Sequence, residues 1–368
     1  MIYDYIIIGA GIAGSSIAYE LNKKTTNILL IEQNDSIASG ASGAAGAFLS
    51  PLLGKANDFK DLVNNALIYS TKFYKENFSK YINNCGTLRL PKDDLAKEQF
   101  NSYKPYIDFD YTQKDNGYFF PIASVVNSKS ICESLVQNIE TIFNTTINDI
   151  KYEDNIYTLN DTFKSKNLII TTGYCTSLID EQYFNIRPVW GQRIDIKTST
   201  CISFNYHKAC SVSVSTKIDK DTNIVSIGAT HHRFVSDNKV NKDDTNELLK
   251  LANDIIKLED VEVIKEVGGA RASSIDYFPM VGKIVNSKST LKKYPYIING
   301  SKVPQENYLC LDNFYAINGL GGRGFVLAPY LAKILVDNIF DNRPIPKNIK
   351  PHRLFTRWAR KQNKRTTT

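Results

Sequence analysis

One glycine-rich turn near the start of the chain constrains the fold more than any other feature. The motif Gly9-Ala-Gly-Ile-Ala-Gly14 lies between the apolar runs Tyr3–Ile8 and Ile28–Ile31, and Glu32 closes the second run. This order predicts a strand, a tight turn at Gly9, a helix, a second strand and an acidic residue, which is the context that gives a glycine triplet its meaning. The segment therefore predicts a Rossmann-like βαβ unit that binds a dinucleotide.

The helix that follows the turn is predicted over Ile12 to Lys24. Gly11 lets the backbone approach a pyrophosphate, and Gly14 lets this helix pack close to the sheet. The free N–H groups of its first turn lie at the positive end of the helix dipole and can hold phosphate oxygens. Glu32 can accept hydrogen bonds from a ribose diol and disfavours an added 2′-phosphate, so the adenylate is predicted to be that of NAD or FAD.

A second run of small residues, Ser39 to Gly46, precedes the apolar segment Ala47 to Pro51. Such a run lets the backbone pass close to a flat ligand and offers several N–H groups. A mobile linker is the alternative, which Phe48 and Leu49 disfavour because these apolar residues follow the run at once. A later glycine turn, Gly319 to Gly324, leads into an apolar helix and provides a second helix N-terminus that can approach a ligand.

Composition places the chain among ordinary globular proteins. It has 368 residues, enough for two domains, and 42% of them are hydrophobic. No segment approaches the roughly 20 apolar residues that span a bilayer, and Asp4 stands where a signal peptide would be basic. The six cysteines lie far apart with no CxxC pair. This spacing predicts reduced thiols in a cytoplasmic protein, with no disulfide framework and no metal cluster.

Apolar periodicity locates the other main elements. Helices are expected at three places: 58–81, about 130–143 and 245–258. Strands are expected as a pair within 146–159, as a buried parallel strand over 167–173, and as three shorter runs at 192–196, 210–214 and 223–230. The chain therefore leaves a nucleotide-binding domain twice and returns to it twice.

The predicted fold class is α/β, in which a Rossmann-like parallel sheet domain is interleaved with an antiparallel-sheet cap domain on the substrate side. The boundaries assigned are 1–82, 127–186 and 268–341 for the nucleotide-binding domain, 83–126 and 187–267 for the cap, and 342–368 for a basic C-terminal tail. In such a fold the ligand lies at the carboxyl ends of the parallel strands.

Positive charge is concentrated in the last part of the chain. The segment 342–368 contains no acidic residue and nine basic ones: Arg343, Lys347, Lys350, Arg353, Arg357, Arg360, Lys361, Lys364 and Arg365. Without them the chain carries 36 basic against 38 acidic side chains. Clustered cations indicate a polyanionic partner such as nucleic acid. A solubilising tail accounts for the same composition, and the charge pattern alone does not decide between the two.

The sequence has no recognisable set of catalytic side chains that would work without a cofactor. It lacks a Ser-His-Asp order, paired carboxylates in a known motif and metal-ligand spacing among its four histidines. Arg271 and Arg323, each in a glycine-rich segment, are the best candidates to clamp a substrate carboxylate, with surface ion pairing as the alternative for either. His231 and His232 would face opposite ways in a strand, which predicts no shared metal and places at least one of them at the cap surface or the substrate mouth.

Several segments together carry a family resemblance: 9–14, Gly40–Leu53, Val189–Gln192, Ala272–Gly282, Gly319–Gly324 and Pro351–Arg357. In order and spacing they resemble the FAD-dependent D-amino-acid oxidase superfamily, which includes glycine and sarcosine oxidases. Within it, the chain is most similar to the oxidoreductase half of the bifunctional tRNA 5-methylaminomethyl-2-thiouridine biosynthesis enzymes. The likeness covers essentially the whole chain.

The resemblance implies FAD as the cofactor and assigns these residues to it: Gly9, Gly11, Ile12, Ala13, Gly14, Glu32, Gln33, Gly40, Ala41, Ser42, Gly46, Ala47, Ile147, Gly173, Gly319, Gly321, Gly322, Arg323 and Gly324. It implies Arg271 and Arg323 as the catalytic carboxylate clamp. Further substrate contacts are implied for Gln192, His231, Arg353 and Arg357. Where the family has Ser-Gly-Asn, this chain ends the element with Ala44, so no side-chain contact is expected at that position.

The implied function is oxidative removal of the carboxymethyl group from carboxymethylaminomethyluridine in tRNA, which gives aminomethyluridine and glyoxylate. tRNA is expected to bind through the basic tail and the cap, without membrane or metal. Because the chain begins at the first Rossmann strand, a separate methyltransferase is expected to act on the product. The alternative within enzymes is an oxidase or dehydrogenase of free glycine, sarcosine or a D-amino acid. A flavin-bearing RNA-binding protein without turnover is the third interpretation.

Overall fold

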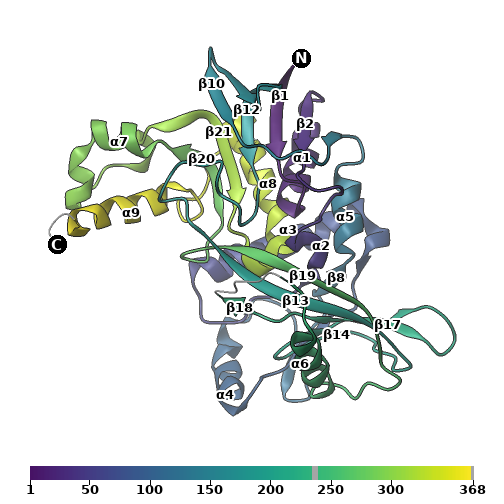
Figure 1. The fold of residues 1–368 in the computed structure, drawn as a ribbon. Helices are drawn as coiled ribbons and strands as arrows, with labels where there is room; N and C mark the ends of the chain where they lie inside the picture. Colours follow the sequence, from purple (N-terminus) through teal and green to yellow (C-terminus); the bar gives the residue numbers. More distant parts are fainter. Residues whose placement is uncertain (234–238, 366–368) are drawn as a thin grey trace.

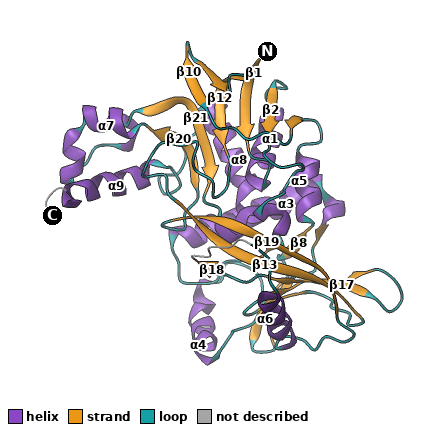
Figure 2. Cartoon of the chain, in the orientation of Figure 1, coloured by secondary structure: helices purple, strands orange, loops and turns teal. Residues whose placement is uncertain are grey.

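Two large sheets organise the molecule (Figure 1). The computed structural model describes residues 1–233 and 239–365, and the side chains of its last helix as far as Gln362. Within these residues the first sheet has eight strands, the second has ten, and a third has three. Figure 2 shows that most helices pack around the first sheet, while the second sheet lies below it.

The first sheet has five parallel strands at its centre: β9 (Glu140–Ile142), β2 (Ile28–Ile31), β1 (Ile2–Ile8), β12 (Phe163–Ile170) and β21 (Cys310–Asn318). Three antiparallel strands complete it: β10 (Ile150–Glu153), β11 (Ile156–Leu159) and β20 (Met280–Val285). On β1, Tyr5 and Ile7 point into one core, whereas Ile6 and Ile8 point into another. The sheet is therefore buried on both faces, as parallel strands require.

Four helices cover the face of the first sheet that Tyr5 and Ile7 enter: α1 (Ile12–Asn22), α3 (Asp58–Asn77), α5 (Ser128–Leu135) and α8 (Gly324–Asp341). The packing of α3 fixes the start of α8. Ser70 Oγ donates to the Val326 carbonyl oxygen at 2.7 Å, and Tyr74 Oη donates to that of Phe325 at 3.0 Å. A short helix, α2 (Ala41–Ala44), lies near the N-terminal end of α1.

The opposite face of the first sheet is covered by the C-terminal part of the chain, through α7 (Ser287–Lys293) and α9 (His352–Arg365). Leu354, Phe355 and Ala359 on α9 are almost fully buried in this core. Over the residues that the structure describes, the segment predicted as a basic C-terminal tail, 342–368, therefore packs onto this core through α9. Apolar residues at helical spacing give α9 a buried face, and Arg357, Arg360 and Lys361 are exposed on the other face.

The second sheet is largely antiparallel, and its strand β19 lies against the small-residue segment at Ala41. In order its strands are β18 (His232–Arg233), β13 (Ile186–Thr198), β17 (Asn223–Gly228), β15 (Ser211–Val212), β14 (Asn205–His207), β5 (Thr87–Arg89), β7 (Gly117–Phe120) and β6 (Thr112–Lys114), with β19 (Glu262–Ser274) on β13 and β16 (Thr216–Lys217) on β17. Helix α6 (Lys242–Asn253) packs against it, and α4 (Asp94–Tyr103) lies below. The third sheet is β3 (Phe48–Leu49), β8 (Ser124–Val126) and β4 (Ile82–Asn83).

The structure confirms the α/β class and also corrects two sequence predictions. The helix expected over 130–143 ends at Leu135, and β9 follows because β-branched Thr141 and Ile142 pair beside β2. Residues 268–274, expected in the nucleotide-binding domain, pair instead with β13 in the second sheet. After β19, the chain returns to the first sheet only at Met280, the first residue of β20.

Helix boundaries shift by a few residues for local reasons. The helix expected over 245–258 is α6, which begins at Lys242 because the Asn241 side chain accepts the Asp244 N–H and caps it. None of the helices in the described part of the chain combines the length and the apolar character that crossing a membrane would need.

Candidate active site

The glycine turn after β1 has no room for side chains. Gly9 has a φ of +102°, and a Cβ there would lie 2.8 Å from the Thr171 carbonyl oxygen on the neighbouring strand end. A Cβ on Gly14 would overlap the Gly9 carbonyl oxygen. Glycine at these positions therefore lets the first turn of α1 approach both the sheet and a ligand.

Glu32 lies at the carboxyl end of β2 beside this turn. Its carboxylate accepts hydrogen bonds from the Ala10 N–H at 2.8 Å and from the backbone and side chain of Asn34 at 3.0 and 2.8 Å. The loop before Ile147 lies alongside, since the Thr145 N–H donates to the Glu32 carbonyl oxygen. Ile147 is buried and Gln33 is exposed. The predicted adenylate residues are thus brought together at one end of the sheet.

The small-residue segment meets the glycine turn at the first residue of α1. The Ser42 hydroxyl accepts the Ile12 N–H at 2.9 Å, and a Cβ on Gly11 would lie 3.0 Å from that oxygen. A Cβ on Gly324, at the start of α8, would lie 3.0 Å from the Ile12 side chain. Ala13 is half-buried on the same turn. The start of α1 therefore joins all three segments predicted to hold the cofactor.

The remaining cofactor candidates surround this point. Gly40 and Gly173 have open space where a Cβ would be, whereas Gly46 lies against the Phe48 ring. Ala47 is buried with a φ of +49°. The Gly319–Gly324 turn lies along β19, where Gly321 is near Ser273 and Gly319 near Ser274. A Cβ on Gly269 of β19 would lie 2.6 Å from Ala41 Cα, so the second sheet contacts the cofactor segment through its backbone.

Arg271 is a residue of β19, and its side chain lies between that strand and the Gly319–Gly324 turn. Its guanidinium donates to the Thr230 carbonyl oxygen at 3.2 Å and, more weakly, to that of Trp190 at 3.4 Å. Gly322 lies 3.7 Å from Arg271 Cδ, measured from a Cβ built on that glycine. Among the described residues no carboxylate pairs with Arg271, and burial lowers the pKa of its side chain. An arginine remains protonated there, so it presents an uncompensated cation.

Arg323 lies in the same region but has a different neighbour. Its guanidinium reaches the Ser50 carbonyl oxygen at 3.5 Å, and the guanidinium of Arg89, from β5, donates to Ser50 Oγ at 3.0 Å and to the Pro51 carbonyl oxygen at 3.1 Å. Arg89 was not predicted, because it stands in the strand Thr-Leu-Arg without a glycine motif. Arg193, also not predicted, donates to the Ala45 carbonyl oxygen at 2.6 Å and pairs with Asp195.

Two residues predicted to bind substrate have structural partners instead. Gln192 is fully buried, and its side chain bonds to the backbone of Asn241 and to Thr245 Oγ1. Arg353 forms two hydrogen bonds to the Asp276 carboxylate, at 2.8 and 2.9 Å, and a third to the Phe278 carbonyl oxygen at 2.6 Å. The Arg353 contacts hold α9 to the loop before β20. The side chains of Gln192 and Arg353 thus both have protein partners, and their contacts with substrate stay a prediction.

The other substrate candidates are accessible. Arg357 is exposed on α9, and His231 is exposed after β17. Partial burial and the nearby Arg271 lower the pKa of His231, so this histidine is close to the unpaired arginine. His232 turns the other way and bonds to Asp244 at 2.8 Å. Ligand atoms of His232, Asp244 and Glu247 lie within 4.8 Å of one another, but Asp244 is already bonded to His232 and Thr230.

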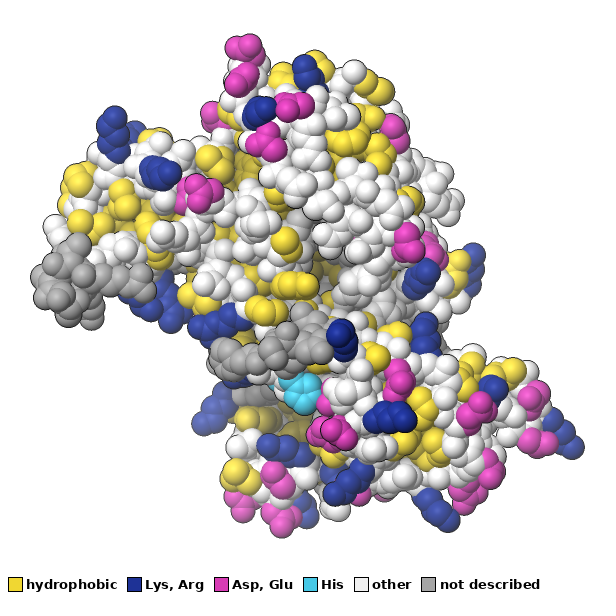
Figure 3. All heavy atoms as spheres, viewed as in Figure 1, with side chains coloured by type: hydrophobic (Ala, Val, Ile, Leu, Met, Phe, Trp, Pro, Cys, Tyr) yellow, Lys and Arg dark blue, Asp and Glu magenta, His cyan; other side chains and the backbone are white. Residues whose placement is uncertain are grey.

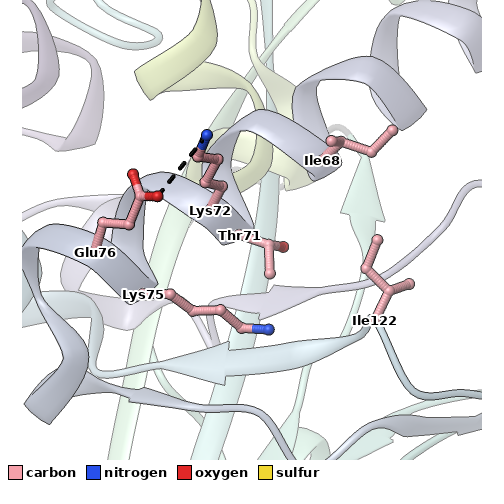
Figure 4. Close-up of a pocket in the computed structure, with 6 residues that line it drawn as sticks. All are labelled: Ile68, Thr71, Lys72, Lys75, Glu76 and Ile122. Atoms are coloured by element: carbon pink, nitrogen blue, oxygen red, sulfur yellow. Dashed lines mark ion pairs between the residues drawn. The ribbon is translucent and has the colours of Figure 1, made fainter.

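A cavity of about 380 Å³ lies elsewhere, on the outer side of α3 (Figure 4). Ile68, Thr71, Lys72, Lys75 and Glu76 of the helix line it, with Ile122 opposite. Lys72 and Glu76 pair across one helical turn at 3.8 Å. None of the predicted cofactor or substrate residues lines this cavity, so it is separate from the candidate site.

Comparison with known proteins agrees with this geometry. The FAD dependent oxidoreductase family, abbreviated DAO, matches residues 4–338. The chain belongs to this family. A curated relative, the tRNA 5-methylaminomethyl-2-thiouridine biosynthesis bifunctional protein MnmC of Marinobacter nauticus, is 23% identical over 97% of this chain and 57% of its own length. The chain thus spans a little over half of that relative.

Solved structures of the same fold include two oxidases. Glycine oxidase from Bacillus cereus superposes with a TM-score of 0.74 at 16% identity, over 93% of this chain and 96% of the oxidase. Iminodiacetate oxidase from a Chelativorans species gives a TM-score of 0.72 at 18% identity, over 94% and 98%. These likenesses support the DAO-type fold. This member of the DAO family is therefore an FAD-dependent oxidoreductase.

The residues present fit FAD. The glycine turn leaves the backbone free to approach a pyrophosphate, Glu32 lies where a ribose would be held, and the Ala41–Ala47 segment faces the Gly319–Gly324 turn across β19. When bound, FAD supplies an acceptor for two electrons and a hydrogen. These segments contribute mainly backbone groups; apart from the Glu32 and Asp195 carboxylates, the ionised groups named in the site are arginines.

Proposed function

We propose that this protein oxidatively removes the carboxymethyl group from carboxymethylaminomethyluridine at the wobble position of tRNA. The products would be aminomethyluridine and glyoxylate. The observation that supports this most is the likeness to MnmC over 97% of the chain, together with Arg271, an arginine without a carboxylate partner beside the cofactor segments. A substrate carboxylate is the natural counter-ion for such a group.

The chemistry assigns clear roles to the residues of this chain. The reacting group is a glycine attached through its nitrogen, and its Cα–N bond is oxidised to an imine with loss of two electrons and two protons. Water then adds to the imine, which releases glyoxylate and leaves the primary amine on the base. Arg271 would hold the carboxylate and thereby orient the Cα–H bond toward the cofactor segments, which is a catalytic contribution through positioning.

The buried setting of Arg271 strengthens this contact. Because Arg271 is half-buried and so partly shielded from water, a guanidinium–carboxylate pair is stronger there than at the surface. Gly191 leaves the space in which the guanidinium lies. His231, whose lowered pKa keeps it neutral at pH 7, adds no competing charge. An amine that arrives unprotonated needs no dedicated base in this arrangement.

The exposed face of α9 fits the RNA part of the substrate. Arg357, Arg360 and Lys361 are exposed on it, and Figure 3 shows Lys and Arg side chains along the lower edge of the projecting part that carries α9. We propose that this face contacts tRNA phosphates in the cytoplasm. All six cysteines are free thiols, as that compartment would maintain. A separate methyltransferase would act on the product.

The test is anaerobic reduction of the bound flavin by defined donors. Carboxymethylaminomethyl-modified tRNA should bleach the flavin, whereas free glycine and sarcosine should not. Arg271→Leu should retain flavin but lose reduction by tRNA, and Lys72→Gln, which changes an exposed lysine paired with Glu76, should behave as wild type. Reduction by free glycine or sarcosine but not by modified tRNA would refute the proposal.

A free amino-acid oxidase is the second candidate. It is favoured by the structural likeness to glycine oxidase and needs the same Arg271 clamp, but it does not need the basic face of α9. Mass spectrometry of wobble uridines from cells with and without this protein separates the two. Accumulation of the carboxymethylaminomethyl form in the deleted strain supports the tRNA function, and an unchanged modification profile supports the free amino acid.

A further inference from the structure

Two further arginines lie in the site beside Arg271: Arg89, and Arg323, which the family resemblance assigns to the carboxylate clamp. Arg89 and Arg323 both approach the Ser50–Pro51 backbone, one from β5 of the second sheet and the other from the turn before α8. Arg89 Nε is buried and has no hydrogen-bond partner among the described residues. Their protein acceptors are two carbonyl oxygens and one hydroxyl.

No acidic side chain in the described chain forms an ion pair with either guanidinium. Burial and the neighbouring Arg323 lower the pKa of Arg89 to about 9, and burial lowers that of Arg323 to about 10. Both remain protonated at neutral pH. Burial and these two arginines also hold the pKa of His207 well below its usual range, so this histidine is neutral. Two positive charges are therefore gathered without a protein counter-ion, which is costly unless a ligand supplies one.

Arg193, a neighbouring arginine, differs in that a carboxylate neutralises its charge. Arg193 reaches the same small-residue segment, at Ala45, but Asp195 pairs with it at 3.2 Å. Arg271 is adjacent to Gly322, the residue before Arg323. A substrate glycine carboxylate would neutralise Arg271 alone. The pair formed by Arg89 and Arg323 is left for a second negative group on the same ligand.

We propose that Arg89 and Arg323 form a second anion subsite, which binds a phosphate of the nucleotide whose base carries the glycine unit. That a phosphate occupies this subsite rests on the proposed tRNA function. That the subsite prefers donors with a second anionic group attached to the amine nitrogen does not rest on it. In a pyrimidine nucleotide with the usual anti base, the C5 substituent and the 5′-phosphate lie on the same side. One ligand can therefore present a carboxylate to Arg271 and a phosphate to this subsite, and paired guanidiniums suit phosphate geometry.

The subsite predicts how the holoenzyme ranks small donors. In anaerobic flavin reduction, the 5′-monophosphate of carboxymethylaminomethyluridine should show an apparent Kd at least about tenfold below that of the nucleoside, since one charged contact is worth about that factor. Iminodiacetate, which has two carboxylates, should likewise outrank sarcosine. Calorimetric titration with uridine 5′-monophosphate and with uridine gives the same comparison without turnover.

Variants locate the effect. In Arg89→Gln the ratio of nucleoside to monophosphate Kd should fall from about ten to below about two, and Arg89→Lys should retain part of it because the charge remains. Lys72→Gln, the control, should keep the full ratio. An equal Kd for nucleoside and monophosphate in the wild type, or an unchanged ratio in Arg89→Gln, would overturn the subsite.

The same experiment distinguishes failure of the subsite from failure of the proposed function. If nucleoside and monophosphate both reduce the flavin with equal Kd, the subsite is wrong and the tRNA function stands. If neither nucleotide donor reduces it, but iminodiacetate outranks sarcosine and Arg89→Gln removes that difference, the tRNA function is wrong and the preference for a second anion stands.

Discussion

The glycine turn at 9–14 and the helix α9 make their contacts with different atoms: the turn uses its backbone, and the helix uses its side chains. Helix α1, which begins at the turn, and α9 cover opposite faces of the first sheet. At the turn the contacts are made by backbone atoms, and there is no space for a Cβ at Gly9 or Gly14. On α9 the contacts are made by side chains, apolar on one face and basic on the other. At the turn, the same backbone positions therefore serve both cofactor binding and packing. On α9, packing and the proposed RNA contacts use different faces of the helix.

The largest effect is expected at the turn itself. Gly14→Ala places a methyl group on the Gly9 carbonyl oxygen, which should cost about 3 kcal/mol of folding free energy and open the turn. The purified variant should contain no flavin. Gly300→Ala, at an exposed glycine that has no cofactor role and whose added methyl group meets no atom within 4 Å, is the control and should keep its flavin-to-protein ratio. A fully flavinated Gly14→Ala would contradict the backbone assignment.

The buried face of α9 provides the next effect. Phe355 is fully buried, so Phe355→Ala should lower the free energy of unfolding by about 3–5 kcal/mol. Lys361→Ala, on the exposed face, should change it by less than about 0.5 kcal/mol. Chemical denaturation measures both. Equal stability of the two variants would mean that the C-terminal segment is an appendage after all.

The tie between α9 and the rest of the molecule is weaker and depends on pH. Burial opposes ionisation of Asp276, but its hydrogen bonds from Arg353 outweigh that and hold its pKa below the ordinary value. This contribution to stability is present above about pH 4 and is lost as the pH falls further. Arg353→Gln should cost about 2 kcal/mol at neutral pH, and the difference from wild type should shrink in acid. Arg357→Gln is the control and should show neither effect.

The smallest effect on stability, with a selective effect on binding, is expected from the basic face of α9. Replacing Arg357, Arg360 and Lys361 together by Gln should alter the free energy of unfolding by less than about 0.5 kcal/mol. The affinity for tRNA should fall, and the slope of log K against log salt should decrease by at most about 3. The same change at Lys72, Lys75 and Lys129, exposed elsewhere, should leave the slope unchanged. An unaltered slope in the α9 variant would remove this face from the RNA-binding surface.

Local signals were sufficient for the cofactor half of the site. The turn, its strands and Glu32 are consecutive, so the order of residue types alone predicts their arrangement. The sequence also contained a signal for α9, because Leu354, Phe355, Trp358 and Ala359 recur at helical spacing, but the density of charge obscured it. Arg89 and the pairing of Arg353 with Asp276 could not be predicted in this way. The pairing of Arg353 with Asp276 joins residues that are 77 positions apart in the sequence. Arg89 stands in a strand that carries no recognisable motif.

Gly191 has a consequence for how the specificity of this site can change. A side chain there would overlap both terminal nitrogens of Arg271 and crowd the Thr230 carbonyl oxygen. The direction in which the guanidinium points is therefore set by an empty volume on the adjacent strand β13. Any residue larger than glycine at this position would turn the arginine away without altering it, so substrate preference could be lost through a residue that never contacts the substrate.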